Sequence, residues 1–203
     1  ALPLAAFQLY GHLGASDQVA QFRDRQQMMQ GGMDASDVDA MVQSLRDRLE
    51  EEPDNPEGWA MLGRSYMQLE RFQDAANAYA ELADAIERSG EGSPAAALGL
   101  HAQALFMANE AKVTPAVEKA IGQARAINPD EVNSLGLRGV EAFRQGDYRE
   151  ALEYWERILR VAPDHPQADS IRQGVTTAYR ELGEPVPSWV MDNGEPAGNE
   201  TGG

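Results

Sequence analysis

The sequence predicts an all-α fold, a solenoid of about three helix pairs with flanking capping helices. One indication is a motif of six residues at fixed spacing: Trp59, Leu62, Gly63, Tyr66, Ala75 and Tyr79. A second is a partial copy at the same offsets: Gly139, Ala151, Trp155 and Pro163. A third is the period, because Pro129 precedes Pro163 by 34 residues. Two copies at one period identify a repeat, and repeats of this length stack as pairs of antiparallel helices.

The residue types in the motif suit the crossing of two helices within a pair. Gly63 and Gly139 permit a close approach that larger side chains would prevent. Large aromatic side chains are expected to fill the space between the helices: Trp59, Tyr66, Tyr79 and Trp155. The spacing is that of a tetratricopeptide repeat. The predicted mode of action is therefore binding rather than chemistry.

The amino-terminal segment carries a separate signal. Residues 1–13 are apolar, contain no charged residue and include an aromatic, Tyr10, near their end. The segment is too short to cross a bilayer and lacks the basic start and cleavage site of a signal peptide. One interpretation is the exit of a transmembrane helix that precedes this sequence. The other is an amphipathic segment that covers the first apolar face of the solenoid.

Periodicity and caps place the remaining elements in order. A polar helix is expected at about 16–30, followed by a break at Gly31-Gly32 and a helix that Ser36 caps and Pro53 ends. The expected helix pairs are 55–69 with 72–88, 94–108 with 115–127, and 131–145 with 148–161, with a closing helix at about 166–182. The predicted domains are 1–14, the exit or cap segment; 15–35, a helix and linker; 36–183, the repeat domain; and 184–203, a mostly disordered tail in which Trp189 can dock locally.

The middle repeat departs from the ideal period. Pro53 and Pro129 are 76 residues apart, which exceeds two repeats of 34 by eight. The extra residues are expected either in the loop-like stretch 89–94 or in the turn 109–114. The turn ends in Thr114-Pro115, a pair suited to capping and starting a helix. The register of the middle repeat therefore depends on which of these two places holds the extra residues.

Composition limits the possible partners. The formal net charge of −16 argues against nucleic acid and against simple adsorption to anionic lipid, and favours basic or apolar partners. The alternative is that the acidic residues only solvate the helix surfaces. The chain contains no cysteine, which excludes disulfides, thiolate chemistry and cysteine-based zinc sites. This composition fits an oxidising compartment without proving one.

An enzyme is not expected. His12, His101 and His165 are far apart in the sequence and none has a partner at ligand spacing, so no metal or cofactor site is predicted. His101 is expected to be a core residue whose hydrogen bonds are satisfied. The sequence contains no glycine-rich phosphate loop and no nucleophile elbow.

Several stretches together resemble one family. They are Leu-Tyr-x-x-Leu-Gly at 9–14, Pro-Asp-Asn-Pro-Glu-Gly-Trp at 53–59, Leu-Gly-Arg-Ser-Tyr at 62–66 and Gly-Asp-Tyr-x-x-Ala-x-x-x-Trp at 146–155. The sequence is similar to the periplasmic tetratricopeptide domain of the CcmI/CycH family of the cytochrome c maturation system, which is similar to NrfG. The resemblance implies a chaperone that holds the C-terminal helix of apocytochrome c and presents it to the haem lyase complex. It also implies two preceding transmembrane helices and a periplasmic domain tethered to the inner membrane.

A peptide-binding groove can be predicted from the first helix of each pair. When these helices are aligned at Gly63, Ala102 and Gly139, three positions fall on the expected concave face. The first of these positions carries small residues in all three helices. The candidate groove residues are Ala60, Arg64, Met67, Gly99, Gln103, Phe106, Gly136, Val140, Phe143 and Arg144. Small residues would let a ligand backbone approach, and Met67, Phe106 and Phe143 would form an apolar stripe for an amphipathic helix. The alternative is that Phe106 and Phe143 pack against neighbouring helices.

A second class of function remains open at this point. A general tetratricopeptide scaffold or adaptor for another envelope complex would have the same fold and the same groove. The segment 9–14 and the identity of the ligand distinguish the two possibilities. The sequence identifies neither the cytochrome nor the oligomeric state.

Overall fold

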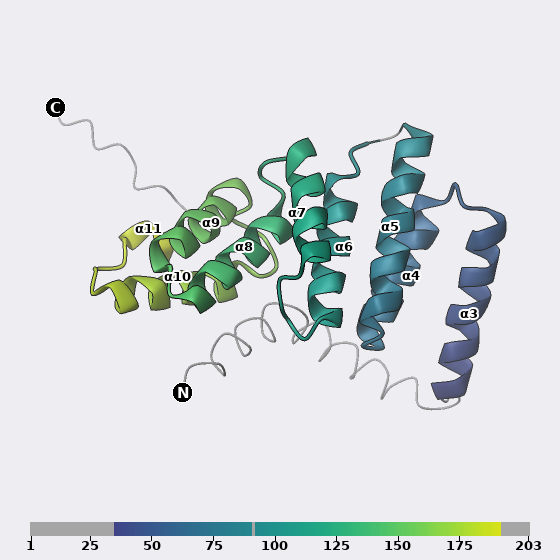
Figure 1. The fold of residues 1–203 in the computed structure, drawn as a ribbon, viewed down its shortest axis with the longest axis horizontal. Coiled ribbons are helices and arrows are strands. Elements are labelled where there is room, and N and C mark those ends of the chain that lie inside the picture. The colour runs from purple at the N-terminus through teal and green to yellow at the C-terminus, as the bar shows by residue number, and fades with distance from the viewer. Residues whose placement is uncertain (1–34, 91, 192–203) are drawn as a thin grey trace. The chain divides into compact units, whose positions relative to one another are not determined.

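The computed structural model describes residues 35–90 and 92–191, and all secondary structure in these residues is helical (Figure 1). The predicted all-α repeat fold is therefore confirmed. The helices are α3 (Ala35–Glu51), α4 (Pro56–Gln68), α5 (Phe72–Ser89), α6 (Ala95–Ala108), α7 (Pro115–Ile127), α8 (Val132–Gln145), α9 (Tyr148–Val161), α10 (Ala168–Leu182) and α11 (Ser188–Met191). The predictions for the exit or cap segment, the helix at 16–30, the break at Gly31-Gly32 and the tail from 192 onward lie outside the described residues.

The described chain forms two compact units, which divide between Ser134 and Leu135. In the first unit α4 packs on α5, α5 on α6 and α6 on α7, so that consecutive helices lie side by side (Figure 1). The helix α3 packs on α4, with Leu49 against Gly58, and Val42 and Leu49 are both buried. In the second unit α9 packs on α10, and α11 follows α10.

Two of the helix pairs, α4–α5 and α8–α9, depend on a glycine that faces an aromatic ring. A Cβ atom added at Gly63 of α4 would lie 2.5 Å from Cε1 and 2.7 Å from Cδ1 of Tyr79 on α5. At Gly139 of α8 the same atom would collide with the indole of Trp155 on α9. Both rings are buried. The predicted close crossing, with an aromatic side chain filling the space beside glycine, is confirmed in both pairs.

Local capping explains where α4 and α7 of the first unit begin. The side chain of Asn55 accepts a hydrogen bond from the Gly58 backbone N–H at 2.9 Å, and Pro56 occupies the first turn of α4. Thr114 caps α7 as predicted, since its Oγ1 accepts from the Val117 N–H at 3.4 Å. The helices of the degenerate middle pair, α6 and α7, start and end within one residue of the predicted bounds.

The structure also shows the surroundings of His101 and Trp189. His101 is half-buried on α6, and its Nδ1 lies 2.7 Å from the carbonyl oxygen of Ala76, so its ring is hydrogen-bonded as expected for a core residue. Trp189 on α11 lies beside α9, with the Arg160 guanidinium 5.4 Å from its ring centroid. The adjacent Val190 is fully buried. The short helix α11 is thus anchored on the second unit.

The glycine in the first pair can be tested with a matched substitution. Gly63→Ala places a methyl group against the Tyr79 ring and is expected to destabilise the protein by about 1–3 kcal/mol through overpacking. Gly122→Ala on α7 is the control, because a Cβ there meets no atom within 4 Å and Ala favours helix by about 0.5–1 kcal/mol. Urea denaturation of both variants measures the difference. Equal stability of the two variants would contradict the packing argument.

Burial of Tyr79 predicts a loss of stability at alkaline pH. Burial raises the pKa of Tyr79 to about 12, against a weaker lowering by the positive charge of Arg64. An unfolded tyrosine ionises near pH 10, so the stabilisation is complete below pH 10 and is lost as the pH rises from 10 to 12. In Tyr79→Phe we expect this loss to shrink by up to about 2–3 kcal/mol. Urea midpoints between pH 8 and 12 provide the measurement, and an unchanged pH dependence in the variant would refute the assignment.

Candidate functional site

The predicted groove residues of α4 are accessible. Arg64 is exposed, while Ala60 and Met67 are half-buried. Trp59, Leu62, Gly63 and Tyr66 form the opposite, buried side of the same helix. The face with Ala60, Arg64 and Met67 therefore offers one cationic and one adaptable apolar side chain to a ligand.

The predicted groove residues of α6 are largely buried, which corrects the expectation for two of them. Phe106 has 0% of its surface exposed, so its ring belongs to the core of the first unit, as the alternative interpretation proposed. Gly99 is also buried, and a Cβ atom there would collide with the carboxylate of Glu131. Its small size thus makes room for an internal side chain rather than for a ligand. Of the three predicted groove residues on this helix, only Gln103, which is half-buried, keeps an accessible surface.

The carboxylate that Gly99 accommodates caps the start of α8. Glu131 is buried, with 4% exposure. Its Oε2 accepts from the Ser134 backbone N–H at 2.7 Å, and its Oε1 accepts from the backbone and side-chain N–H groups of Asn133, each at 3.0 Å. A carboxylate at this position satisfies donors that every helix leaves unpaired at its first turn and interacts favourably with the helix dipole.

The predicted groove residues of α8 belong to the second unit and are again only partly accessible. Val140 is 3% exposed and belongs to the core, which corrects the prediction for this residue. Gly136 and Phe143 are half-buried and Arg144 is exposed. The Phe143 ring lies 5.1 Å from that of Tyr148 and 5.5 Å from that of Trp155, between ring centroids. The ring therefore packs against α9 and exposes only part of its surface.

The ten predicted residues thus fall into two separate sets. Six lie in the first unit and four in the second. Within each set, residues of the same helix lie close together along one side of it. The accessible members are Ala60, Arg64, Met67, Gln103, Gly136, Phe143 and Arg144.

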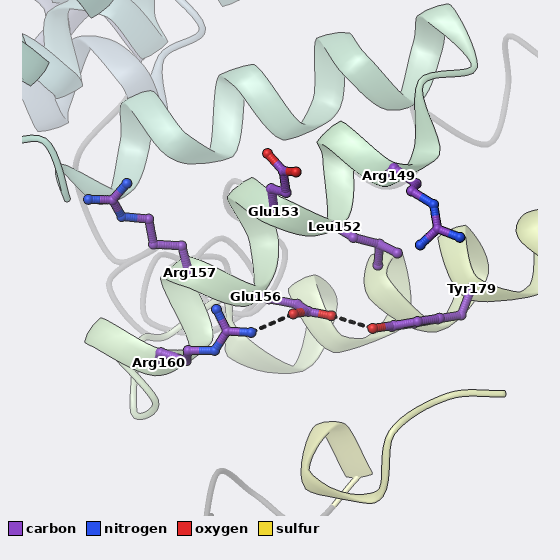
Figure 2. A pocket seen from close by; sticks show the side chains of 7 residues that line it. All are labelled: Arg149, Leu152, Glu153, Glu156, Arg157, Arg160 and Tyr179. Carbon is purple, nitrogen blue, oxygen red and sulfur yellow. Dashed lines mark hydrogen bonds and ion pairs between the residues drawn. The ribbon is translucent and has the colours of Figure 1, made fainter. Parts of the chain in front are cut away.

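A hollow that sequence reasoning missed runs along α9 in the second unit (Figure 2). Its volume is about 470 Å³. It is lined by Arg149, Leu152, Glu153, Glu156, Arg157, Arg160 and Tyr179. The six residues from α9 recur every three or four positions and so form one face of the helix, while Tyr179 comes from α10. The alternation of Arg and Glu at this spacing was the signal available in the sequence.

Glu156 is the centre of the polar network in this hollow (Figure 2). Its carboxylate accepts from Arg160 Nη2 at 2.6 Å and from the Tyr179 hydroxyl at 2.6 Å. Burial, and then the hydrogen bond to Glu156, raise the pKa of Tyr179 to about 12. The phenol consequently stays protonated and acts as a donor. With Arg149 paired to Glu184, the hollow presents organised hydrogen-bonding groups of both charge signs.

This arrangement suits recognition of a polar surface. Within residues 35–90 and 92–191, no group of three or more His, Asp or Glu residues could hold a metal ion. In the same residues no helix is long and apolar enough to span a membrane.

Comparison with known proteins assigns the family. The family described as "Cytochrome c-type biogenesis protein H TPR domain" matches residues 11–168. The chain belongs to this family. It is 36% identical over 180 residues to the cytochrome c-type biogenesis protein CycH of Pseudomonas aeruginosa, covering 89% of this chain and 42% of that protein. It is 30% identical over 122 residues to the formate-dependent nitrite reductase complex subunit NrfG of Escherichia coli O157:H7, covering 60% of this chain and 59% of NrfG.

The fold of this family member also resembles a solved structure. A crystal structure of MamA superposes with a TM-score of 0.53 and 20% sequence identity, covering 80% of this chain and 92% of MamA. At this identity the likeness concerns the fold alone. The chain spans less than half the length of the CycH relative, so the resemblance to CycH concerns one part of a longer protein. The names of the relatives connect the family with cytochrome c maturation.

Burial of Phe106 yields a stability prediction. Phe106→Ala is expected to destabilise the protein by about 3–5 kcal/mol, because it removes a fully buried ring and leaves a cavity. Arg64→Ala, on an exposed position, is expected to change stability by less than about 0.5 kcal/mol. Urea denaturation measures both values. If Phe106→Ala were as mild as Arg64→Ala, the ring would have to lie at the surface.

Proposed function

We propose that this domain is an apocytochrome c-binding chaperone. It captures the C-terminal helix of c-type apocytochromes and presents them to the haem lyase complex for haem attachment. The observation that carries the proposal is the family match over residues 11–168, supported by relatives that are named for cytochrome c biogenesis. We further propose that the domain lies in the periplasm and is tethered to the inner membrane in the full-length protein.

The geometry of the accessible residues fits a helical guest. Met67 provides a flexible apolar contact and Arg64 a cationic one on the same face of α4. In the second unit, considered separately, the half-buried Phe143 and the exposed Arg144 offer an apolar and a cationic side chain at adjacent positions of α8. An amphipathic helix presents an apolar stripe bordered by polar residues, which such a surface complements. No enzymatic step is assigned to the domain, because holding and presenting a chain requires only binding.

The distribution of charge favours a basic guest on the first unit. Residues 35–134 contain 8 Lys and Arg against 18 Asp and Glu, a formal charge of −10. Residues 135–191 contain 7 against 9, a formal charge of −2. Complementary charge raises the rate of encounter and its dependence on ionic strength. A guest helix rich in Lys would therefore be attracted mainly to the first unit.

Binding can be tested with the unmodified chain and one cytochrome in two forms. In calorimetry, a peptide of the C-terminal helix of an apocytochrome c is expected to bind at least about tenfold more tightly than the folded holocytochrome, whose helix is already packed in its own core. A helical peptide of equal charge and unrelated sequence is the control. Equal affinity for the three ligands would reject the chaperone proposal and favour a general adaptor.

The contribution of α4 can be measured in the same titration. Arg64→Ala should weaken binding at low salt and lose its effect as the salt concentration rises, because an exposed charge is screened. Lys119→Ala is the matched control, since Lys119 is exposed on α7 and is not among the proposed contact residues. Equal effects of the two substitutions would indicate general electrostatic attraction without a defined site.

A further inference from the structure

The residues of α3 can be aligned with those of α5, α7 and α9, each of which is the second helix of a pair. Proline follows α3, α7 and α9 at positions 53, 129 and 163. Twelve residues before each proline stand Met41, Val117 and Ala151. Eight residues before each stand Leu45, Ile121 and Trp155. The motif residues Ala75 and Tyr79 place α5 in the same register, so all four helices can be compared position by position.

The comparison reveals an uncovered face on α3. Val117, Ala151 and Ala75 are each 0% exposed, whereas Met41 is 61% exposed. Ile121, Trp155 and Tyr79 are between 1% and 3% exposed, whereas Leu45 is only half-buried. In the pairs α4–α5 and α8–α9 the residues at these positions face the first helix of the same pair. The contacts of Gly63 with Tyr79 and of Gly139 with Trp155 demonstrate this. On α3 the corresponding apolar side chains have no such cover among the described residues.

A second and independent position, on α4, also carries an apolar side chain that is more fully covered in the other pairs and exposed here. Met61, Leu100 and Leu137 stand two residues before Gly63, Ala102 and Gly139, the alignment points of the three first helices. Leu137 is 0% exposed and Leu100 is half-buried, but Met61 is 54% exposed. A large apolar residue is thus present at this position in every pair and is uncovered only at the amino-terminal edge of the described repeats. Exposed methionines at both Met41 and Met61 mark the place of a missing first helix.

We propose that residues 16–30 of this chain form that helix and pack against Met41, Leu45 and Met61. The segment lies outside the described residues, and its sequence predicts a helix. Val19, Phe22 and Met29 are spaced by three and seven residues, which places them on one face. A helix of 15 residues also matches the first helices of the other pairs, which have 13 or 14 residues. The domain then begins with a fourth helix pair, 16–51.

The length of the connection also supports residues 16–30 as the occupant. Four residues, 31–34, separate the predicted helix from the start of α3. The connections within the described pairs have three residues between α4 and α5, six between α6 and α7, and two between α8 and α9. Short connections make consecutive helices antiparallel neighbours. Gly31 and Gly32 supply the conformational freedom that such a turn requires.

Methionine oxidation in the full 203-residue chain tests the proposal. Peroxide oxidises accessible methionines, and peptide mass spectrometry gives the rate at each site. We expect Met41 and Met61 to react at least about tenfold faster in Phe22→Asp than in the unaltered chain, because the substitution places a charge in the packed face. Gln27→Asp adds the same charge about 140° away on the helix and should leave both rates unchanged. Met107 on α6 is the internal reference.

The other outcomes overturn the proposal. Equal rates in the unaltered chain and in Phe22→Asp would show that residues 16–30 do not cover this face. Protection of Met41 and Met61 that increases with protein concentration would assign the face to a second copy of the chain. Protection that arises only on addition of an apocytochrome peptide would assign it to the guest.

A cross-link gives a second readout that does not depend on reactivity. Because the chain contains no cysteine, two introduced cysteines form a single defined pair. Phe22→Cys with Met41→Cys should form an intramolecular disulfide under mild oxidation, and Gln27→Cys with Met41→Cys should not. Equal cross-linking in both variants, or none in either, would also refute the packing of residues 16–30 on α3.

Discussion

The fold depends on the contact between a glycine and an aromatic ring where two antiparallel helices cross. At Gly63 and at Gly139 no room remains for a Cβ atom, because Tyr79 and Trp155 occupy that space. The contact fixes both the distance between the helices and the position at which they cross. The packing around the two crossings is consistent with that geometry: α5 buries a row of alanines, α9 buries Ala151, and α6 packs on the other side of α5.

The sequence was sufficient to predict where the helices begin and end. It was insufficient to predict which side of some helices is buried. Helix bounds follow from local signals such as the Asn55 and Thr114 caps, and these signals act within four residues of the chain. Whether Phe106 or Val140 points to the core depends on side chains far away in the sequence, which an alignment of first helices does not contain. Gly99 illustrates the difficulty, since its environment is determined by Glu131, a residue of the following helix pair. The hollow along α9 could not be predicted from an apolar stripe, because most of its residues are charged.

The two compact units differ in character as possible binding surfaces. The first carries most of the negative charge and offers accessible side chains on α4, while the second is nearly neutral and holds a network of paired Arg, Glu and Tyr groups. An acidic surface attracts a basic chain over a distance, whereas a network of fixed hydrogen bonds discriminates at contact. A protein that handles unfolded chains can use both properties. In that case capture and selection are distributed over different parts of the same domain.

The contact between Gly99 and Glu131 has a consequence for the evolution of the family. The glycine leaves room for the carboxylate, and the carboxylate caps α8, so neither residue can change freely while the other is retained. An alanine at position 99 is compatible only with a shorter cap, such as Asp, Ser or Thr, at position 131. The two positions should therefore exchange together among homologous sequences. Such a linked pair, 32 residues apart, would identify the start of α8 in relatives whose repeats have lost every other recognisable motif.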